Sequence, residues 1–321
     1  MIKKYDYNQI TLVSEKISEI KNRAECNTSS CLGSVLECDI PIINAPMVDV
    51  ADCHSVSEVS KSGGIGLLHR FGPIEDRIAE YISCTYAQYK CSNIGVSIGI
   101  TEGYKEEFVK FLDHGATLFC VDVANSSSYR VKEAVLSLTK IHPYARFIVG
   151  NAMSKAGVDF WDDIDQVVAV RCGVAGGAGC TTKNATGMYH PMASLIQECS
   201  KNKKKIIIAD GGIREPQDFC KAICLGADLV MVGSVLATCK DSPAKTENGC
   251  KIFKGSASQE NQKLYKQSPK YIEGKQINLP VSDLTIAQTI VKYQEGLQSS
   301  MSYSNAKNLT DYRLFTEIFA L

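Results

Sequence analysis

Short apolar runs rich in β-branched residues alternate along the chain with longer stretches in which apolar residues recur every three or four positions. The short runs predict strands, and the longer stretches predict amphipathic helices. The predicted strands cover 41–44, 64–68, 93–98, 118–121, 147–149, 166–170, 205–209 and 229–232, and the predicted helices include 74–88, 104–114, 129–142, 192–200 and 216–225. Eight such units favour a closed, parallel (β/α)8 TIM barrel over an open doubly wound sheet.

Two segments fall outside this alternation. Residues 1–40 precede the first predicted strand, and we expect this N-terminal extension to cover the bottom or the side of the barrel. Residues from about 239 to 280 are polar and rich in Lys and Gln, which favours a mobile flap or lid. Apolar spacing from about residue 283 predicts a last helix after the flap. We therefore expect a single domain over 1–321.

Composition narrows the classes of function. Lys plus Arg and Asp plus Glu both number 35, and this balance argues against a nucleic-acid footprint or a polybasic membrane surface. No apolar run reaches the roughly 20 residues of a membrane helix, and the polar opening of the chain does not resemble a secretory signal. The 14 cysteines follow no regular spacing, so we expect reduced thiols in a cytoplasmic protein, without a disulfide framework or a zinc site.

Glycines follow the last two predicted strands. Asp210-Gly211-Gly212 comes after one strand, and Gly233-Ser234 comes after the other. In a barrel this pair of strand ends often binds phosphate through backbone N–H groups and a helix N-terminus. Tight strand-to-helix turns are the alternative for either motif alone, but the presence of both favours a phosphate site. Asp210 would then accept hydrogen bonds from ribose hydroxyls.

The most distinctive stretch runs from 171 to 183 and alternates glycine with other small residues. It places Cys180 at the rim where barrels carry their active sites, and partial exposure there favours a nucleophilic thiolate. A buried structural thiol is the ordinary alternative, which we keep for the other cysteines. The backbone carbonyls of the loop are candidate ligands for a monovalent cation such as K⁺, at Ala175, Gly177, Cys180 and Lys183.

Taken in order along the chain, these motifs resemble those of the IMP dehydrogenase/GMP reductase family, from about residue 6 to residue 309. The resemblance implies that the Cys180 thiolate attacks C2 of a bound purine nucleotide, and that hydride passes between this carbon and a nicotinamide. The motifs that carry it are Tyr7-Asn-Gln-Ile-Thr-Leu-Val13, Ile40-Pro-Ile-Ile-Asn-Ala-Pro-Met47, Gly63-Gly-Ile-Gly-Leu-Leu-His-Arg70, Asp122-Val-Ala-Asn125, Cys180-Thr-Thr182, Ile208-Ala-Asp-Gly-Gly-Ile-Arg214, Gly226-Ala-Asp-Leu-Val-Met-Val-Gly-Ser234 and Phe253-Lys-Gly255.

Several features favour the reductase branch of this family. The chain has no inserted pair of regulatory CBS-type modules, and the flap between Gly255 and Glu273 contains no Arg. The motif 122–125 and the segments 272–280 and 302–309 resemble reductase sequences. The branch implies NADPH-dependent reductive deamination of GMP to IMP and ammonia by a homotetramer. The alternatives are an IMP dehydrogenase without regulatory modules and a nonenzymatic purine-nucleotide sensor.

The resemblance also assigns roles to individual residues. Thr182 and Glu273 form the proton-transfer pair, although Glu273 without the resemblance reads as an exposed loop acid. The residues implied to hold the nucleotide are Asp210, Gly211, Gly212, Gly233, Ser234, Gly255, Ser256, Ala257, Lys270 and Gly274. Those implied to hold the dinucleotide are Asn22, Arg23, Arg70, Asp122, Val123, Ala124, Val174, Ala175, Ser299, Ser300, Met301 and Ser302.

The sequence departs from the family pattern in the loop before Cys180. The family's Gly-Pro-Gly-Ser-x-Cys is Ala175-Gly-Gly-Ala-Gly-Cys180 here, so a proline and a serine are missing. Lys183 and Lys270 stand where the family has Arg, and Lys keeps the charge without the bidentate fork. The segments around 63–70 and 242–243 are closer to the dehydrogenase branch. These departures bear on substrate preference and cation binding more than on the class of reaction.

Overall fold

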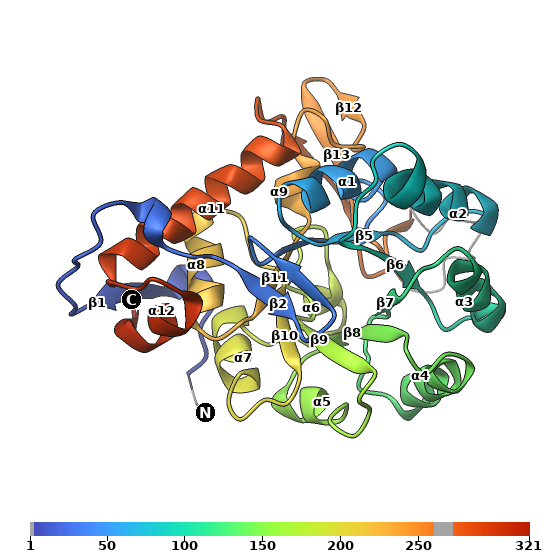
Figure 1. Cartoon of the computed structure of the whole chain (residues 1–321), viewed down its shortest axis with the longest axis horizontal. Helices are drawn as coiled ribbons and strands as arrows, with labels where there is room; N and C mark the ends of the chain where they lie inside the picture. The colour runs from blue at the N-terminus through green and yellow to red at the C-terminus, as the bar shows by residue number, and fades with distance from the viewer. Residues whose placement is uncertain (1–2, 260–271) are drawn as a thin grey trace.

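A parallel sheet of eight strands forms the centre of the computed structural model, which describes residues 3–259 and 272–321. Neighbouring strands pair in chain order from β5 to β11, β11 pairs with β4, and a bridge between Ile43 and Ile65 closes the ring (Figure 1). The strands are β4 (Ile42–Asn44), β5 (Gly66–Leu68), β6 (Ile94–Ile98), β7 (Leu118–Asp122), β8 (Arg146–Ala152), β9 (Val167–Cys172), β10 (Ile206–Asp210) and β11 (Leu229–Val232). The predicted TIM barrel and its eight strands are confirmed.

Helices surround the barrel and pack their apolar stripes against the strands. In α4, for example, Val131, Ala134, Val135 and Leu138 are buried, which is the spacing of one helix face. The five predicted helices correspond to α2 (Ile74–Ile82) with its π-helical continuation η3 (Ser83–Ala87), α3 (Tyr104–Asp113), α4 (Tyr129–Ile141), α7 (Met192–Cys199) and α8 (Pro216–Cys224). The described helices outside the predicted ranges include α1 (Cys53–Lys61), α5 (Lys155–Asp159), α6 (Thr182–Thr186) and α9 (Ser234–Ala237).

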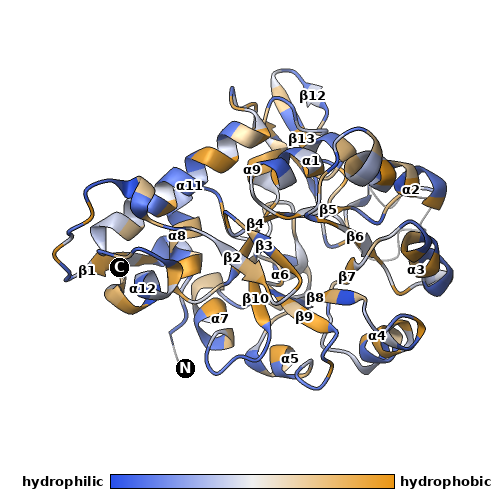
Figure 2. Ribbon diagram, viewed as in Figure 1, coloured by the Kyte–Doolittle hydropathy of each residue, from blue (hydrophilic) through white to orange (hydrophobic). Residues whose placement is uncertain are grey.

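The core has an inner and an outer part. Inside the ring, side chains such as Leu67, Ile148 and Ile208 form one buried cluster. Between strands and helices lies a larger cluster, in which the rings of Phe108 and Phe119 are 4.6 Å apart between centroids. Figure 2 shows this arrangement, with hydrophobic strands at the centre and hydrophilic outer faces on the helices. Because the inside of the ring is packed, a ligand site is left only at an end of the barrel.

The N-terminal extension closes one of these ends. A hairpin of β2 (Ser30–Leu32) and β3 (Leu36–Cys38) lies in front of the ring in Figure 1. Leu32 and Cys38 belong to the inner cluster, and the Ser30 hydroxyl donates to the carbonyl of Asp228, which immediately precedes β11. The hairpin therefore covers the amino ends of the strands, as expected of this extension, and the carboxyl ends face the other way.

The first and last strands of the chain lie side by side. β1 (Ile10–Ser14) pairs antiparallel with β15 (Thr316–Ala320), beside the barrel. The 3-10 helix η1 (Tyr7–Gln9) precedes β1, and α12 (Leu309–Phe315) precedes β15. The helix predicted after the flap is α11 (Ile286–Tyr303), but it is not the last helix, because α12 follows it. Thr285 caps the first turn of α11, because its side-chain oxygen accepts from the N–H of Gln288.

The predicted flap is partly a sheet. Its described residues include β12 (Thr246–Glu247), β13 (Cys250–Lys254) and β14 (Gln276–Pro280), which pair antiparallel. Sequence analysis expected no strands here, because the exposed positions of β14 carry polar residues and the alternation is too short to stand out. Residues 260–271, which include Lys270, lie outside the described residues, so mobility of the flap stays a prediction.

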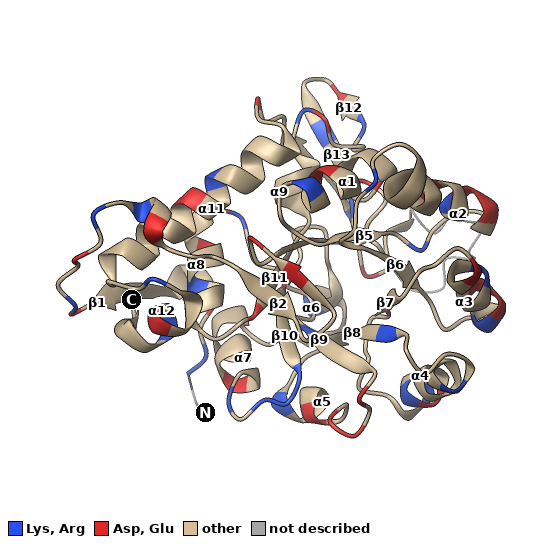
Figure 3. Cartoon of the chain, in the orientation of Figure 1, with Lys and Arg blue, Asp and Glu red and all other residues tan. Residues whose placement is uncertain are grey.

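Charged residues of both signs alternate along the ribbon of the outer helices in Figure 3. This distribution agrees with the equal totals of acidic and basic residues. Among the described residues, no helix combines the length and the apolar composition needed to cross a bilayer.

Candidate active site

A cavity of about 340 Å³ opens at the carboxyl ends of the strands. Most of the predicted site residues line it, although they come from positions 70 to 273. From the predicted catalytic and nucleotide sets these are Cys180, Thr182, Glu273, Asp210, Gly211, Gly212, Gly233, Ser234, Gly255, Ser256 and Ala257; from the predicted dinucleotide and cation sets they are Arg70, Asp122, Val123, Ala124, Val174, Ala175 and Gly177.

Cys180, Thr182 and Glu273 form a continuous chain of hydrogen bonds on the cavity wall. The Cys180 thiol lies 3.2 Å from the Thr182 hydroxyl oxygen, and that hydroxyl donates to Oε2 of Glu273 over 2.7 Å. Cys180 itself is half-buried, whereas Cys120, in the middle of β7, and Cys172, at the end of β9, are fully buried. The arrangement connects a reachable sulfur to a carboxylate through one hydroxyl, so a proton has a direct path between a group bound at Cys180 and Glu273.

Backbone pairing brings Glu273 to the cysteine loop. The N–H of Thr181 donates to the carbonyl of Glu273 over 2.9 Å, and the N–H of Lys275 donates to the carbonyl of Gly179 over 2.9 Å. The N–H of Gly255 also donates to the carbonyl of Lys275. The segment from 273 to 275 thus bridges the nucleophile loop and the end of β13. The position of Glu273 follows from these bonds and not from its neighbours in sequence.

Close backbone approach explains the glycines around the cavity. Gly173 has φ +145°, and a Cβ there would lie 2.0 Å from the carbonyl oxygen of Asp210. Gly211 has φ +109°, and its Cβ would lie 2.9 Å from the carbonyl carbon of Gly176. The N–H of Gly212 donates to the carbonyl of Gly176 over 3.0 Å. The two glycine-rich segments therefore hold each other in place, which only residues without side chains permit.

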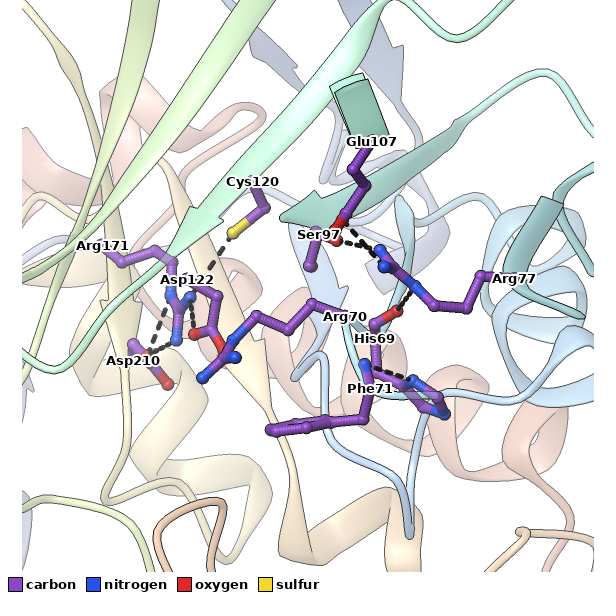
Figure 4. A network of polar contacts seen from close by, with 10 residues as sticks. All are labelled: His69, Arg70, Phe71, Arg77, Ser97, Glu107, Cys120, Asp122, Arg171 and Asp210. Carbon is purple, nitrogen blue, oxygen red and sulfur yellow. Dashed lines mark hydrogen bonds and ion pairs between the residues drawn. The ribbon is translucent and has the colours of Figure 1, made fainter. Parts of the chain in front are cut away.

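A buried ion-pair network lies at the base of the cavity (Figure 4). Arg171 extends from β9 between two carboxylates, 2.7 Å from Asp122 on β7 and 2.9 Å from Asp210 on β10. Arg70 lies 3.1 Å from the other oxygen of Asp122. Burial alone would raise the pKa of Asp122, but Arg171 and Arg70 outweigh it and hold that pKa below its usual value. The Asp122 carboxylate is therefore a charged acceptor, and Arg171 fixes the distance between it and the carboxylate of Asp210.

Arg171 and Asn151 are two polar residues of the site to which the sequence analysis assigned no role. Arg171 is an isolated charge in the otherwise apolar strand β9, and a charge that must be buried there is a signal for a functional network. The side-chain amide of Asn151 donates to Asp210 over 2.7 Å and to the carbonyl of Gly173 over 2.6 Å. Both residues line the cavity and orient Asp210.

Some predicted residues lie elsewhere. Gly274 forms a bridge to Cys180 without lining the cavity, and Lys183 has its ammonium 4.1 Å from the ring centre of Tyr189. Asn22 caps η2 (Arg23–Glu25), which packs against α11. The second part of the predicted dinucleotide set is on this side too, because Ser299, Ser300, Met301 and Ser302 belong to α11. We call Asn22, Arg23 and these four residues of α11 the outer group, and none of them lines the cavity.

The candidate cation ligands are partly engaged within the chain. The carbonyl of Gly177 accepts from the N–H of Cys180, and the carbonyl of Lys183 accepts from the N–H of Gly187. These bonds use one lone pair of each oxygen and leave the second. Ala175 has φ +62°, a left-handed conformation that is unusual for a residue with a side chain. Cation binding by this loop stays a prediction.

Comparisons with known proteins identify the family of the chain. The family model described as "IMP dehydrogenase / GMP reductase domain" matches residues 4–319. A GMP reductase of Streptococcus pyogenes serotype M5 (strain Manfredo) is 32% identical over 324 residues, covering 96% of this chain and 93% of the relative. A GMP reductase of Acidovorax sp. (strain JS42) is 31% identical over 320 residues, covering 96% and 94%.

A solved structure extends the comparison to the fold. The crystal structure of a GMP reductase variant from Trypanosoma brucei, in complex with guanosine 5'-monophosphate, superposes with a TM-score of 0.89. The match covers 100% of this chain and 96% of that chain at 18% identity, so it supports the shared barrel alone. With the family model spanning nearly the whole sequence, and relatives above 30% identity, this chain belongs to the IMP dehydrogenase/GMP reductase family.

Proposed function

We propose that this protein is a GMP reductase that converts GMP, with NADPH, into IMP, ammonia and NADP⁺. The observation that carries the proposal is the hydrogen-bonded chain Cys180–Thr182–Glu273 on the wall of the cavity. Binding alone requires no such chain, which argues against a nucleotide sensor. The names of the two bacterial relatives, both GMP reductases, support the same activity.

The proposed reaction divides into two steps at one carbon. In the first, the Cys180 thiolate bonds to C2 of GMP, and the bond from C2 to the 2-amino nitrogen breaks. Thr182, relaying a proton from Glu273, protonates this nitrogen so that it leaves as ammonia. In the second, C2 accepts a hydride and its bond to Cys180 breaks, which returns the electron pair to sulfur and releases IMP. When bound, NADPH supplies the hydride and becomes NADP⁺.

The chain's own residues fit both reactants. The glycine-rich turns after β10 and β11 and the start of α9 offer backbone N–H groups to a nucleotide phosphate, and Asp210 offers a carboxylate to ribose. Arg70 and the residues 122–124 line the same cavity, and they are the candidates to hold the nicotinamide half of a dinucleotide. Reductive deamination suits the flap as well, because 256–272 contains no Arg that would activate water for hydrolysis of the adduct.

The outer group of predicted dinucleotide residues supports a homotetramer. Asn22, Arg23 and the end of α11 do not line this chain's cavity, yet they are predicted to bind the same cofactor as Arg70 and Asp122. A symmetric assembly reconciles the two groups if a neighbouring subunit brings its outer group to the cavity of this one. In that assembly each dinucleotide would be held by two subunits.

One assay separates the candidate functions. Purified protein is mixed first with GMP and NADPH and then with IMP and NAD⁺, while absorbance of the reduced nicotinamide is recorded. We expect loss of absorbance in the first mixture only. Gain in the second mixture alone would instead identify an IMP dehydrogenase, and binding of GMP without turnover in either would identify a sensor. The Cys180→Ala variant is the control, and it should bind GMP while losing turnover.

A further inference from the structure

A second pair of thiols lies outside the catalytic chain. The thiol of Cys84, in the π-helix η3, donates to the sulfur of Cys53 over 3.3 Å and lies 3.5 Å from the carbonyl oxygen of Cys53. Cys53 is the first residue of α1 and is half-buried, whereas Cys84 is fully buried. Neither residue lines the cavity that contains Cys180, so the proposed reaction leaves this pair unexplained.

The environment of Cys53 favours its thiolate. The hydrogen bond from Cys84 lowers the pKa of Cys53 to about 6, against the opposing effects of burial and of the Asp52 carboxylate. The pKa of Cys84 is raised well above its usual value, chiefly by the same hydrogen bond and by burial. The hydrogen bond thus favours the thiolate at Cys53 and the neutral thiol at Cys84, which is how a reactive cysteine and its resolving partner divide their roles.

Access distinguishes this pair from a comparable one. Cys172 and Cys199 are also hydrogen bonded to each other, but both side chains are 0% exposed. An oxidant in solution meets Cys53 at the surface and does not meet either member of the buried pair. A disulfide requires its sulfurs about 2.05 Å apart, so Cys53 and Cys84 have to approach by only about 1.2 Å, a shift within reach of small side-chain rotations.

We propose that Cys53 and Cys84 form a redox-active dithiol that a peroxide converts into an intramolecular disulfide. The Cys53 thiolate attacks one oxygen of hydrogen peroxide and becomes a sulfenic acid as the O–O bond breaks, and the departing hydroxide takes up a proton and leaves as water. The thiol of Cys84 then attacks this sulfur, and a second water leaves as the S–S bond forms. In total two thiols lose two electrons and two protons, and one peroxide is reduced to two waters.

The disulfide would tie α1 to η3 beside the loop that leads from β4 into α1. Ala45, Pro46 and Met47 of this loop line the nucleotide cavity. Further along the loop, the buried Asp49 accepts from the backbone N–H of Lys254 over 2.7 Å, next to the predicted nucleotide residue Gly255. The proposed modification site is therefore separate from the active site but joined to it by a short connection.

Mass spectrometry tests the proposal on the full chain. The Cys180→Ala variant, which removes the competing nucleophile, is treated with hydrogen peroxide at pH 7 while folded, alkylated with iodoacetamide and digested. We expect a linked peptide pair containing Cys53 and Cys84, two hydrogens lighter than the separate peptides and restored by dithiothreitol. The linked pair should persist when Cys250→Ser is added, because Cys250 is half-buried but has no part in the pair.

The linked pair should disappear with Cys53→Ser and with Cys84→Ala. If Cys84→Ala does not fold, the comparison between Cys53→Ser and the protein with both cysteines intact still tests the proposal. Oxidation of Cys53 to sulfinic acid without linkage would overturn the proposal, and so would linkage of Cys172 to Cys199 at the same peroxide concentration. Absence of linkage at concentrations that oxidise the exposed Cys31 would overturn it too.

Labelling kinetics provide a second readout. The rate at which iodoacetamide labels Cys53 should change less than about twofold between pH 7 and pH 9, because the thiolate is already formed at pH 7. A free model thiol with a pKa near 8.5 should react roughly 25-fold faster at pH 9 than at pH 7. A rise of that size at Cys53 would contradict its role as the attacking thiolate.

Discussion

Single side chains have distinct roles in the reaction proposed for the candidate site. Cys180 is the only member of the catalytic chain that bonds to carbon in the proposed reaction, whereas Thr182 and Glu273 move the proton that lets ammonia leave. The 2.7 Å bond between their oxygens shows that the relay is in place before substrate arrives. The two functions are therefore separable by substitution.

Glu273→Gln tests this separation. Glutamine keeps a hydrogen-bond partner for Thr182 but cannot supply the proton, so we expect kcat for GMP to fall by about 10²–10⁴, the usual contribution of general acid–base catalysis. Hydride transfer, followed as NADPH formation from IMP and NADP⁺ in a single turnover, should change much less. Thr182→Ser keeps the hydroxyl and is the matched control. Equal loss in both half-reactions would remove Glu273 from its assigned role.

Ala175→Gly tests a departure from the family pattern at one residue. Ala175 occupies φ +62°, a region that costs a residue with a side chain about 1–2 kcal/mol. Glycine removes this cost, but it also increases the conformational entropy of the unfolded chain, which offsets part of the gain. We therefore expect the free energy of unfolding to rise by about 0.5–1 kcal/mol. Denaturant unfolding measures the change. The same substitution at Ala178, which also lines the cavity but has no positive φ, is the control and should not stabilise.

At the scale of elements, the ends of β7, β9 and β10 are joined through Arg171. A buried arginine between two carboxylates fixes the spacing of Asp122, predicted to contact the dinucleotide, and Asp210, predicted to contact the nucleotide. The cost of taking these charges out of water is balanced only while all partners are present. Arg171 thus positions two binding groups without touching the reacting carbon.

Arg171→Met should lower the free energy of unfolding by about 3–5 kcal/mol, because it leaves Asp210 without its ion-pair partner and Asp122 with Arg70 alone. Arg171→Lys keeps the charge but not the fork, so we expect a folded enzyme in which KM rises for both GMP and NADPH while kcat changes less. Denaturant unfolding and steady-state kinetics measure these effects. Arg146→Met is the control. Arg146 is the first residue of β8 and donates only to backbone carbonyls near the surface, so this substitution should leave the free energy of unfolding and both KM values nearly unchanged. A rise in KM for one substrate alone would contradict the positioning of both.

The elements also show what sequence predicts and what it does not. The strands and the main helices can be predicted from apolar periodicity, because each carries its own buried residues at a regular spacing. The strands in the described parts of the flap do not follow from periodicity. β13 and β14 form by pairing with each other, although residues 260–271 separate them in the sequence. In the site, Cys180 stands out in its glycine-rich loop, but Glu273 has no local signal. Its position depends on backbone bonds to residues about 90 positions away, and only the family resemblance pointed to it.

At the scale of the whole molecule, the placement of the outer dinucleotide residues is informative. Asn22 and Arg23 pack with α11 on the flank of the barrel, away from the residues that line the cavity. If a neighbouring subunit completes each cofactor site, then damage to Arg23 in one subunit and damage to Cys180 in its neighbour fall on the same site. Another site can then keep both an intact Cys180 and an intact Arg23.

Subunit mixing tests this arrangement. Cys180→Ala and Arg23→Ala are each expected to lose most activity, and co-expression should restore about a quarter of the wild-type rate, since in random mixtures about one site in four combines an intact cysteine with an intact neighbour. Light scattering confirms that the mixed species is oligomeric. Mixing of Cys180→Ala with Glu273→Gln is the control and should restore nothing, because both residues belong to one cavity. Failure of the first mixture to recover, in confirmed mixed oligomers, would place Arg23 outside the cofactor site.

The pairing of β1 with β15 has a consequence for synthesis of the chain. Residues 10–14 are translated early, but their hydrogen-bonding partners at 316–320 come some 300 positions later. At about 5–20 residues per second the ribosome needs roughly 15–60 s to cover that distance. Throughout this interval the edge of β1 lacks its native partner, and a strand of another nascent chain would find it open. We therefore expect this protein to aggregate more during fast overexpression, when polysomes are crowded, than a barrel whose terminal segments do not pair with each other.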